Sequence, residues 1–144
     1  MPQHGNLVAR QLYVGFAFSR ASEMLISKAE EFKSALRQRG YDVFNFIGLT
    51  KGTSLDVYEW EIKYCIRECD GFIGICDEAS IGLGWELGES VRLGKPTLAV
   101  AHVDSMVTRL VLGAAEAEPN LRFETYEDLV RDIPPLVDGL FASS

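Results

Sequence analysis

The sequence predicts a single α/β domain, a doubly wound and mostly parallel sheet of five strands with helices on both faces. Its length of 144 residues is that of one ordinary domain. The 47% hydrophobic and 24% charged fractions match globular averages, which excludes a disordered chain or a coiled coil. Short apolar runs alternate along the chain with helical patterns, as they do in consecutive βαβ units.

The N-terminal third predicts a strand, a helix and a second strand. Residues 1–11 are polar and are expected to be a flexible segment before a domain over residues 12–141. Leu12–Phe18 is a short apolar run, typical of a buried strand. An amphipathic helix follows, ended by Gly40, and Tyr41–Ile47 forms the second strand. The apolar stripe of the helix consists of Leu25, Ala29, Phe32 and Leu36.

The remaining elements continue the alternation. A turn-rich loop at Gly48–Leu55 precedes a second helix over Asp56–Glu68, with Val57, Trp60 and Tyr64 expected on one face. The other elements, in chain order, are a strand at Gly71–Cys76, a glycine-bearing turn at Asp77–Gly84, a helix ending before Gly94, a strand at Thr97–Ala101, a short helix at Thr108–Ala115, a strand at Leu121–Thr125 and a last helix made irregular by Pro134 and Pro135.

This flavodoxin-like or Rossmann-like arrangement predicts where a ligand binds. In parallel sheets, ligands lie beyond the carboxyl ends of the strands, at the point where strand order reverses. Four segments are expected at that rim: Phe18–Ser22, Gly48–Leu55, Asp77–Glu86 and His102–Thr108.

The composition also excludes several classes of function. Fourteen basic and 21 acidic side chains give a net charge of −7, which opposes sequence-independent binding to nucleic acid. No apolar run approaches the roughly 20 residues of a membrane span, and no signal peptide is expected. Cys65, Cys69 and Cys76 form no CxxC pair, which predicts reduced thiols, a cytoplasmic location and no metal site.

The most informative stretch is Ser80–Gly88, with the sequence SIGLGWELG. Its glycines do not follow the GxGxxG spacing, because Leu87 occupies the third position, and this disfavours a dinucleotide site. A phospho-receiver domain would use Asp77 at the end of the third strand. The acidic pair that such domains carry after the first strand is absent.

Glu86 is the carboxylate of this stretch and is predicted in the first turn of a helix at the ligand-facing rim. The partial positive charge and free N–H groups of a helix N-terminus favour an ionised carboxylate, as a nucleophile requires. Gly82 and Gly84 would let the backbone approach a flat or bulky ligand closely. The alternative is that Glu86 only interacts with the helix dipole.

The stretch SIGLGWELGESVRLGKP, with Asp70 sixteen residues before Glu86, resembles the signature of the nucleoside 2-deoxyribosyltransferase superfamily. Within it, the chain is most similar to the 2′-deoxynucleoside 5′-phosphate N-hydrolase branch, sometimes called the Rcl family, from about Leu12 to Asp128. The resemblance implies that Glu86 attacks the anomeric carbon and forms a glycosyl-enzyme ester, without a cofactor or metal. Water resolves this ester in the hydrolases of the family, and a second base does so in the transferases.

The resemblance also implies roles for other residues. Tyr13 matches a tyrosine near the sugar and the nucleophile, and Ser80 matches a serine that contacts the 5′-phosphate. Thr108 stands where the family supplies a serine to the same phosphate from the neighbouring subunit of a homodimer. Arg20 is the candidate positive partner. Without the resemblance, Tyr13 is equally a core aromatic residue, Ser80 a helix-entry serine and Arg20 a surface cation.

One departure from the family concerns the second carboxylate. The family places an aspartate eight residues before the equivalent of Asp70, where this chain has Ile62. Glu61 is adjacent, but on a regular helix it points about 100° away, so it substitutes only if the helix shifts register. The base pocket is expected to depend on Phe18 and on the loop Gly48–Leu55.

The expected function is hydrolysis of the N-glycosidic bond of (deoxy)nucleoside 5′-monophosphates to free base and sugar 5-phosphate, with Glu86, Tyr13 and Glu61 as catalytic residues. Two alternatives stay open. A deoxyribosyltransferase would exchange bases, although such enzymes commonly have an aspartate at the position of Ser80. A non-catalytic nucleotide-binding module is favoured by Ile62 in place of the acid.

Overall fold

The computed structural model describes residues 9–17, 22–45 and 52–142. Five parallel strands form one sheet in the order β2-β1-β3-β4-β5. The chain alternates strands and helices, and the reversal of strand order falls between β1 and β3. The predicted fold class is therefore confirmed, with every strand pair parallel. The strands are β1 (Gln11–Phe16), β2 (Asp42–Val43), β3 (Gly71–Ile75), β4 (Thr97–His102) and β5 (Leu121–Tyr126).

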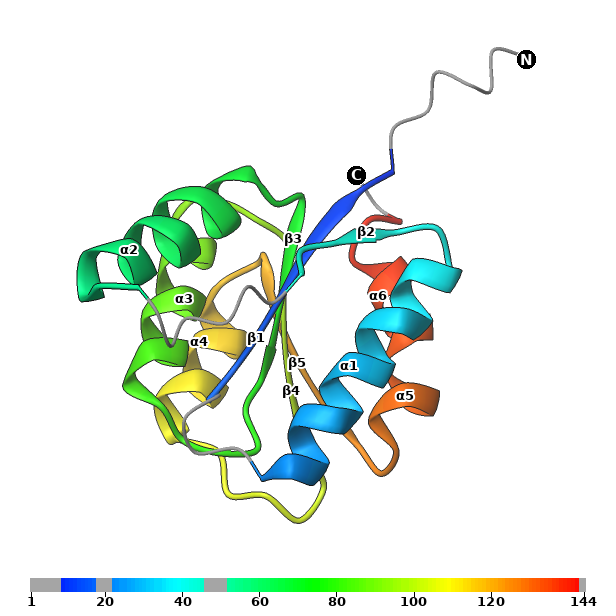
Figure 1. The fold of residues 1–144 in the computed structure, drawn as a ribbon. Coiled ribbons are helices and arrows are strands. Elements are labelled where there is room, and N and C mark those ends of the chain that lie inside the picture. Colours follow the sequence, from blue (N-terminus) through cyan, green and yellow to red (C-terminus); the bar gives the residue numbers. More distant parts are fainter. Residues whose placement is uncertain (1–8, 18–21, 46–51, 143–144) are drawn as a thin grey trace.

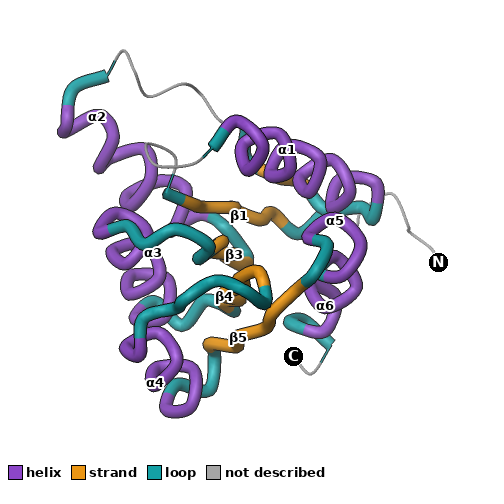
Figure 2. Tube along the Cα trace, turned by 90° about the horizontal axis from the view of Figure 1, so that it is seen from below, coloured by secondary structure: helices purple, strands orange, loops and turns teal. Residues whose placement is uncertain are grey.

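Helices cover both faces of this sheet (Figures 1 and 2). One layer consists of α1 (Glu23–Gln38), α5 (Leu129–Asp132) and α6 (Pro134–Gly139), whose apolar side chains pack on the sheet in one buried cluster. The opposite layer consists of α2 (Ser54–Tyr58), the π-helix η4 (Glu59–Ile66), α3 (Ile81–Arg92) and α4 (Arg109–Ala117). A second cluster lies beneath η4 and α3, and its buried residues include Ile62, Phe72 and Leu87. No helix in the described part of the chain is long and apolar enough to cross a membrane.

The first helix forms as its sequence predicts. Ser22 caps its N-terminus by accepting a hydrogen bond from the backbone N–H of Leu25. Ala29, Phe32 and Leu36 of the predicted stripe are fully buried. Gly40 follows the helix with a φ of +97°, a conformation that glycine adopts without strain.

Two predicted elements differ in the structure. Within the described residues, the second strand covers only Asp42–Val43 of the predicted Tyr41–Ile47 and pairs with β1. Positions 46 and 47 lie outside the described residues. The predicted helix over Asp56–Glu68 begins earlier, at Ser54, where Thr53 and Asp56 form a capping box.

This second helix also changes type along its length. Its last part is the π-helix η4, so the 3.6-residue period does not hold and the expected face of Val57, Trp60 and Tyr64 is not the buried one. Tyr64 is half exposed, and the buried side chains of η4 are those of Ile62, Cys65 and Ile66.

The C-terminal region agrees with the prediction. Ile133 separates α5 from α6, and Pro134 begins the second of these helices, at the irregularity expected from the two prolines. Most of the expected N-terminal segment lies outside the described residues, as do Phe18, Arg20 and residues 48–51 of the predicted loop Gly48–Leu55. Gln11, within the segment expected to be flexible, already belongs to β1.

Candidate active site

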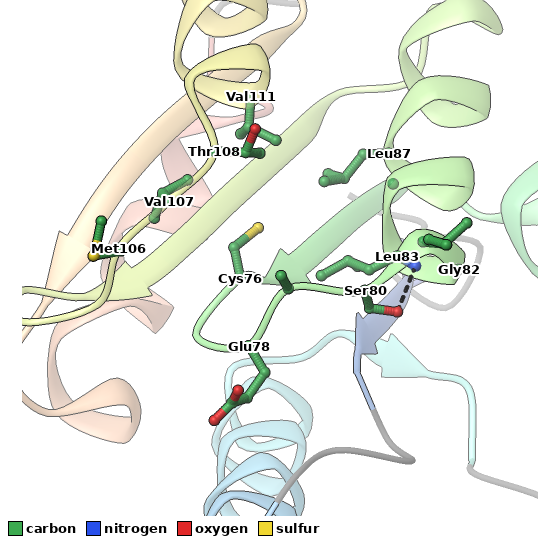
Figure 3. A pocket seen from close by; sticks show the side chains of 13 residues that line it. Cys76, Glu78, Ser80, Gly82, Leu83, Leu87, Met106, Val107, Thr108 and Val111 are labelled. Carbon is green, nitrogen blue, oxygen red and sulfur yellow. Dashed lines mark hydrogen bonds between the residues drawn. The ribbon is translucent and has the colours of Figure 1, made fainter.

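The helix that carries Glu86 begins earlier than the sequence predicts. Ser80 caps α3 by accepting a hydrogen bond from the N–H of Leu83, 3.2 Å away, and Ile81 is the first helical residue (Figure 3). Glu86 is therefore the sixth residue of α3 and lies in its second turn. The prediction of a first-turn carboxylate was wrong, because Gly82 and Gly84 belong to the helix rather than to a turn before it. The free N–H groups of the helix start do not reach Glu86.

Glu86 instead finds its partners on the neighbouring elements. Its side chain is 4% exposed and faces β1, where the Tyr13 hydroxyl donates a hydrogen bond to Glu86 Oε2 at 2.5 Å. Glu61 on η4 lies near the same carboxyl group, and its charge raises the pKa of Glu86. A strand, a π-helix and α3 thus bring together the three residues predicted to be catalytic. We call these three residues the carboxylate cluster.

Burial dominates the electrostatics of this cluster. It raises the pKa of Glu86 well above the usual range, and the nearby Glu61 charge raises it further, whereas the Tyr13 hydrogen bond opposes the rise. Burial also raises the pKa of Glu61. The pKa of Tyr13 is raised by burial first and by the charge of Glu86 second. Two carboxyl groups this close favour a state in which they share one proton.

The π-helix explains how Glu61 reaches Glu86. A π-helix has more residues per turn than an α-helix, so it presents side chains in a different register. In η4, Ile62 packs into the buried apolar cluster while the half-buried Glu61 interacts with Glu86. The sequence predicts that Glu61 can take the place of the family aspartate only if the helix shifts register, and the π-helix provides such a shift.

A cavity of about 620 Å³ lies beside α3, toward α4. Ser80, Gly82, Gly84 and Thr108 line it, four of the residues predicted to bind substrate (Figure 3). Thr108 caps α4 by accepting a hydrogen bond from the N–H of Leu110. Two helix N-termini therefore open toward one cavity from a single chain. The remaining lining residues are Cys76, Glu78, Ala79, Ile81, Leu83, Leu87, Met106, Val107 and Val111.

The glycines of α3 leave backbone open to this cavity. A Cβ atom added to Gly84 would meet no atom within 4 Å, and one on Gly82 would meet only the Ser80 hydroxyl at 3.7 Å. Both positions thus offer bare helix surface to a ligand, as the sequence predicts.

The cavity adjoins the carboxylate cluster at Gly82, which lines the cavity and lies four residues before Glu86 on the same face of α3. Leu83 and Leu87 face the cavity, whereas none of Glu86, Tyr13 and Glu61 lines it. Among the described residues that line the cavity, Glu78 is the one with a charged side chain. The predicted cation Arg20 and the predicted base-pocket residue Phe18 lie outside the described residues.

Asp77 is a site residue whose role the sequence did not indicate. Its carboxylate accepts hydrogen bonds from the Tyr126 hydroxyl at 2.5 Å and from the backbone N–H of His102 at 3.2 Å. These bonds join the ends of β3, β4 and β5 and hold the loop that leads to Ser80. Asp70, the aspartate sixteen residues before Glu86, accepts a hydrogen bond from the backbone N–H of Gln11 at 2.6 Å.

The cysteines carry no separate site in this structure. Cys65, Cys69 and Cys76 are buried free thiols, and burial raises the pKa of each to about 12. Among the described residues, no group of three or more histidine, cysteine or acidic side chains is arranged to hold a metal ion.

Comparison with known sequences gives distant relatives. No protein-family model matches the chain. It is 25% identical over 87 residues to the 5-hydroxymethyl-dUMP N-hydrolases of Rattus norvegicus and Mus musculus, a match that covers 59% of the chain. The aligned part is 51% and 48% of those proteins, so the chain spans about half the length of the curated relatives it matches.

Comparison with solved structures shows the fold. A CMP N-glycosidase from Clostridium botulinum superimposes with a TM-score of 0.71 at 18% identity, covering 90% of this chain and 98% of that one. The 2-deoxyribosyltransferase of Bacillus psychrosaccharolyticus gives 0.60 at 22% identity, with 83% and 87% covered. That of Leishmania mexicana gives 0.52 at 18%, with 86% and 87% covered. The sequence relatives are thus N-hydrolases, and the fold is that of the CMP N-glycosidase and of the two 2-deoxyribosyltransferases, in agreement with the resemblance of the motif.

Proposed function

We propose that this chain is an N-glycosidase that hydrolyses nucleoside 5′-monophosphates to free base and sugar 5-phosphate. The observation that carries the proposal is the carboxylate cluster, in which a buried glutamate accepts a hydrogen bond from Tyr13 and lies near a second carboxyl group that raises its pKa. The relatives named as nucleotide N-hydrolases and the fold neighbour named as a CMP N-glycosidase support the same class of substrate.

In the proposed reaction, ionised Glu86 attacks the anomeric carbon as the bond to the base breaks. The bonding electrons leave with the base, which takes up one proton, and a glycosyl ester forms on Glu86. Water then attacks the anomeric carbon, gives up a proton and releases the sugar phosphate while the Glu86 carboxylate is restored. This sequence needs one acid and one base at different times.

Glu61 is the residue we assign to that proton transfer. In the free protein, burial and the Glu61 charge favour the proton on Glu86, whereas the Tyr13 hydroxyl favours charge there. The proposed reaction therefore requires this proton to pass from Glu86 to Glu61 before the attack, and Glu61 then gives it to the departing base. Once the base has left, the ionised Glu61 can take the proton of the attacking water. Ile62, which replaces the acid of the family, needs no role in this scheme.

The phosphate is assigned to the cavity beside α3. The Ser80 and Thr108 hydroxyls accept hydrogen bonds as helix caps and keep their own protons for an anion. Ser80 stands six residues before Glu86 on α3, about 9 Å along the helix axis, so a bound sugar phosphate would extend along the helix over Gly82 and Gly84. Arg20 and Phe18 are assigned to the phosphate and the base, respectively.

We also propose that the protein acts as a cytoplasmic homodimer. Ile81 and Met106 line the cavity yet are 86% and 96% exposed, and α4 has no buried residue. Such apolar side chains around an open site are suited to cover by a second copy of the chain. The three free thiols are consistent with a reducing compartment.

A base-release assay tests the proposal. The purified protein is incubated with each ribo- and deoxynucleoside 5′-monophosphate and with the unphosphorylated nucleosides, and free base is measured by chromatography. We expect release from at least one monophosphate and none from the Glu86→Ala variant. No release from any nucleotide by the folded protein would overturn the hydrolase. In that case, exchange on adding a free base would indicate a transferase, and tight binding without turnover a binding module.

A further inference from the structure

Two glycines lie side by side in the sheet beneath α3. Gly15 on β1 and Gly74 on β3 are register partners of the parallel ladder. Gly15 and Tyr13 are two residues apart and share the face of β1 that is turned toward α3. Neither glycine has a positive φ, so the backbone conformation alone would accept other residues. Space is therefore what restricts these positions to glycine.

The two positions face different atoms of α3. A Cβ atom on Gly15 would lie 2.7 Å from Glu86 Oε1 and 2.9 and 3.0 Å from two ring carbons of Phe72. A Cβ atom on Gly74 would meet only hydrocarbon, with Leu87 Cδ2 at 3.1 Å and Leu83 Cδ1 at 3.3 Å. The carboxylate of Glu86 thus rests directly on the bare backbone of β1.

We propose that Gly15 is a positioning residue that fixes the carboxylate of Glu86 against Tyr13. One face of the carboxylate lies on Gly15, and the Tyr13 hydroxyl donates a hydrogen bond to Oε2. A methyl group at position 15 would displace the carboxylate from this position. The carboxylate is the free end of a side chain and can move, whereas the buried Phe72 ring must also shift, so the change acts on the geometry of the cluster as well as on stability. This inference rests on the proposed function for its kinetic part only.

The groups that face the carboxylate determine what its displacement changes. They are Tyr13 from β1, and Glu61 and Cys65 from η4. The Tyr13 hydrogen bond lowers the pKa of Glu86, whereas burial and Glu61 raise it. Moving the carboxylate away from Tyr13 weakens the one contribution that favours its ionised form. The apparent pKa of the carboxyl pair is then expected to rise.

The test compares Gly15→Ala with Gly74→Ala, the register partner in the same buried ladder. ¹³C NMR titration of the glutamate side-chain carboxyls measures the pKa of Glu86 without any substrate. The Glu86 signal is assigned from its loss in Glu86→Gln. We expect an upward shift for Gly15→Ala and none for Gly74→Ala. In base release, we expect kcat to fall about 100-fold for Gly15→Ala with KM nearly unchanged, since small misplacements of reacting groups have effects of this size.

The outcomes separate the two proposals. If the wild-type protein releases no base, the proposed function fails, but the titration still tests whether Gly15 positions the Glu86 carboxylate. An unchanged Glu86 titration in Gly15→Ala, or an equal shift in both variants, overturns the inference. If contact with Phe72 prevents Gly15→Ala from folding, Phe72→Leu with and without Gly15→Ala gives the same comparison, because the conflict with Glu86 Oε1 remains.

Discussion

The two sides of α3 differ in the chemistry they offer. The side that faces β1 and η4 holds the carboxylate cluster, buried, hydrogen-bonded and closed to solvent at Glu86. The side that faces α4 holds an open cavity lined by Ser80, Thr108 and apolar side chains. One helix therefore contributes to a buried polar site and to an open, largely apolar surface, which adjoin at Gly82.

This difference suits the carboxylate cluster to chemistry and the cavity to substrate binding. Charged groups whose pKa values are shifted must be held still, and burial against a strand and a π-helix does this. Substrate contacts need room, and bare glycine surface beside two helix caps supplies it. Substitutions on the first side should change rates and pH profiles, and those on the second side should change KM.

The largest effect after loss of Glu86 itself is expected for Glu61→Gln. Removing the proton donor should lower kcat about 100-fold, the usual range for general acid–base groups. Because the Glu61 charge raises the pKa of Glu86, the acid limb of the rate profile should move to lower pH. The profile of kcat/KM measures both. Glu59→Gln, an exposed residue of the same π-helix, is the matched control.

A smaller effect of opposite sign on pH is expected for Tyr13→Phe. The variant loses the 2.5 Å hydrogen bond that favours ionised Glu86, so the acid limb should move to higher pH and kcat should fall roughly 10-fold. Tyr41→Phe removes a surface hydroxyl bonded to Asp138 and serves as control. Shifts in the same direction for Tyr13→Phe and Glu61→Gln would contradict the cluster as described.

The same contrast separates what could be predicted from the sequence from what could not. The hydrophobic pattern and the residues that end helices predicted α1 and the order of the strands, because apolar stripes and Gly40 are local signals. The motif around Glu86 predicted the cluster members and the cavity hydroxyls by resemblance. The start of α3 was missed because Gly82 and Gly84 look like turn residues, although the Ser80 cap decides the boundary.

Non-local features had no signal of this kind. In the π-helix η4, Ile62 and Cys65 pack against residues of α3 and the sheet that are distant in the chain. The Asp77 bonds to Tyr126 and His102 join residues far apart in the chain. The contact of Gly15 with Glu86 is likewise visible only once β1 and α3 are packed together.

On the cavity side, Ser80→Ala should raise KM for the monophosphate roughly 10-fold, the effect of one hydrogen bond to a charged group. KM for an unphosphorylated nucleoside should not change. The loss of the cap should also destabilise the protein by about 1 kcal/mol. Ser22→Ala removes an equivalent cap from α1 and should cause the same loss of stability with KM unaltered. An equal rise in KM for both variants would assign the effect to stability alone.

The smallest effect concerns stability and has opposite signs for two glutamates of α3. Burial raises the folded-state pKa of Glu86, so the folded protein binds the proton more tightly than the unfolded chain does. Stability is therefore lost as pH rises from about 4.5 through the folded pKa, and Glu86→Gln should be more stable than the wild type by about 1 kcal/mol at pH 7. The gain should vanish near pH 4.

Glu89→Gln should have the opposite effect. A hydrogen bond from Arg92 lowers the pKa of Glu89, so this substitution should lower the stability of the protein by up to about 0.5 kcal/mol at pH 7. Urea unfolding from pH 4 to 8 measures the stability of both variants. If Glu86→Gln were less stable than the wild type at pH 7, the buried carboxylate would have to be held in its ionised form by contacts stronger than the Tyr13 hydrogen bond.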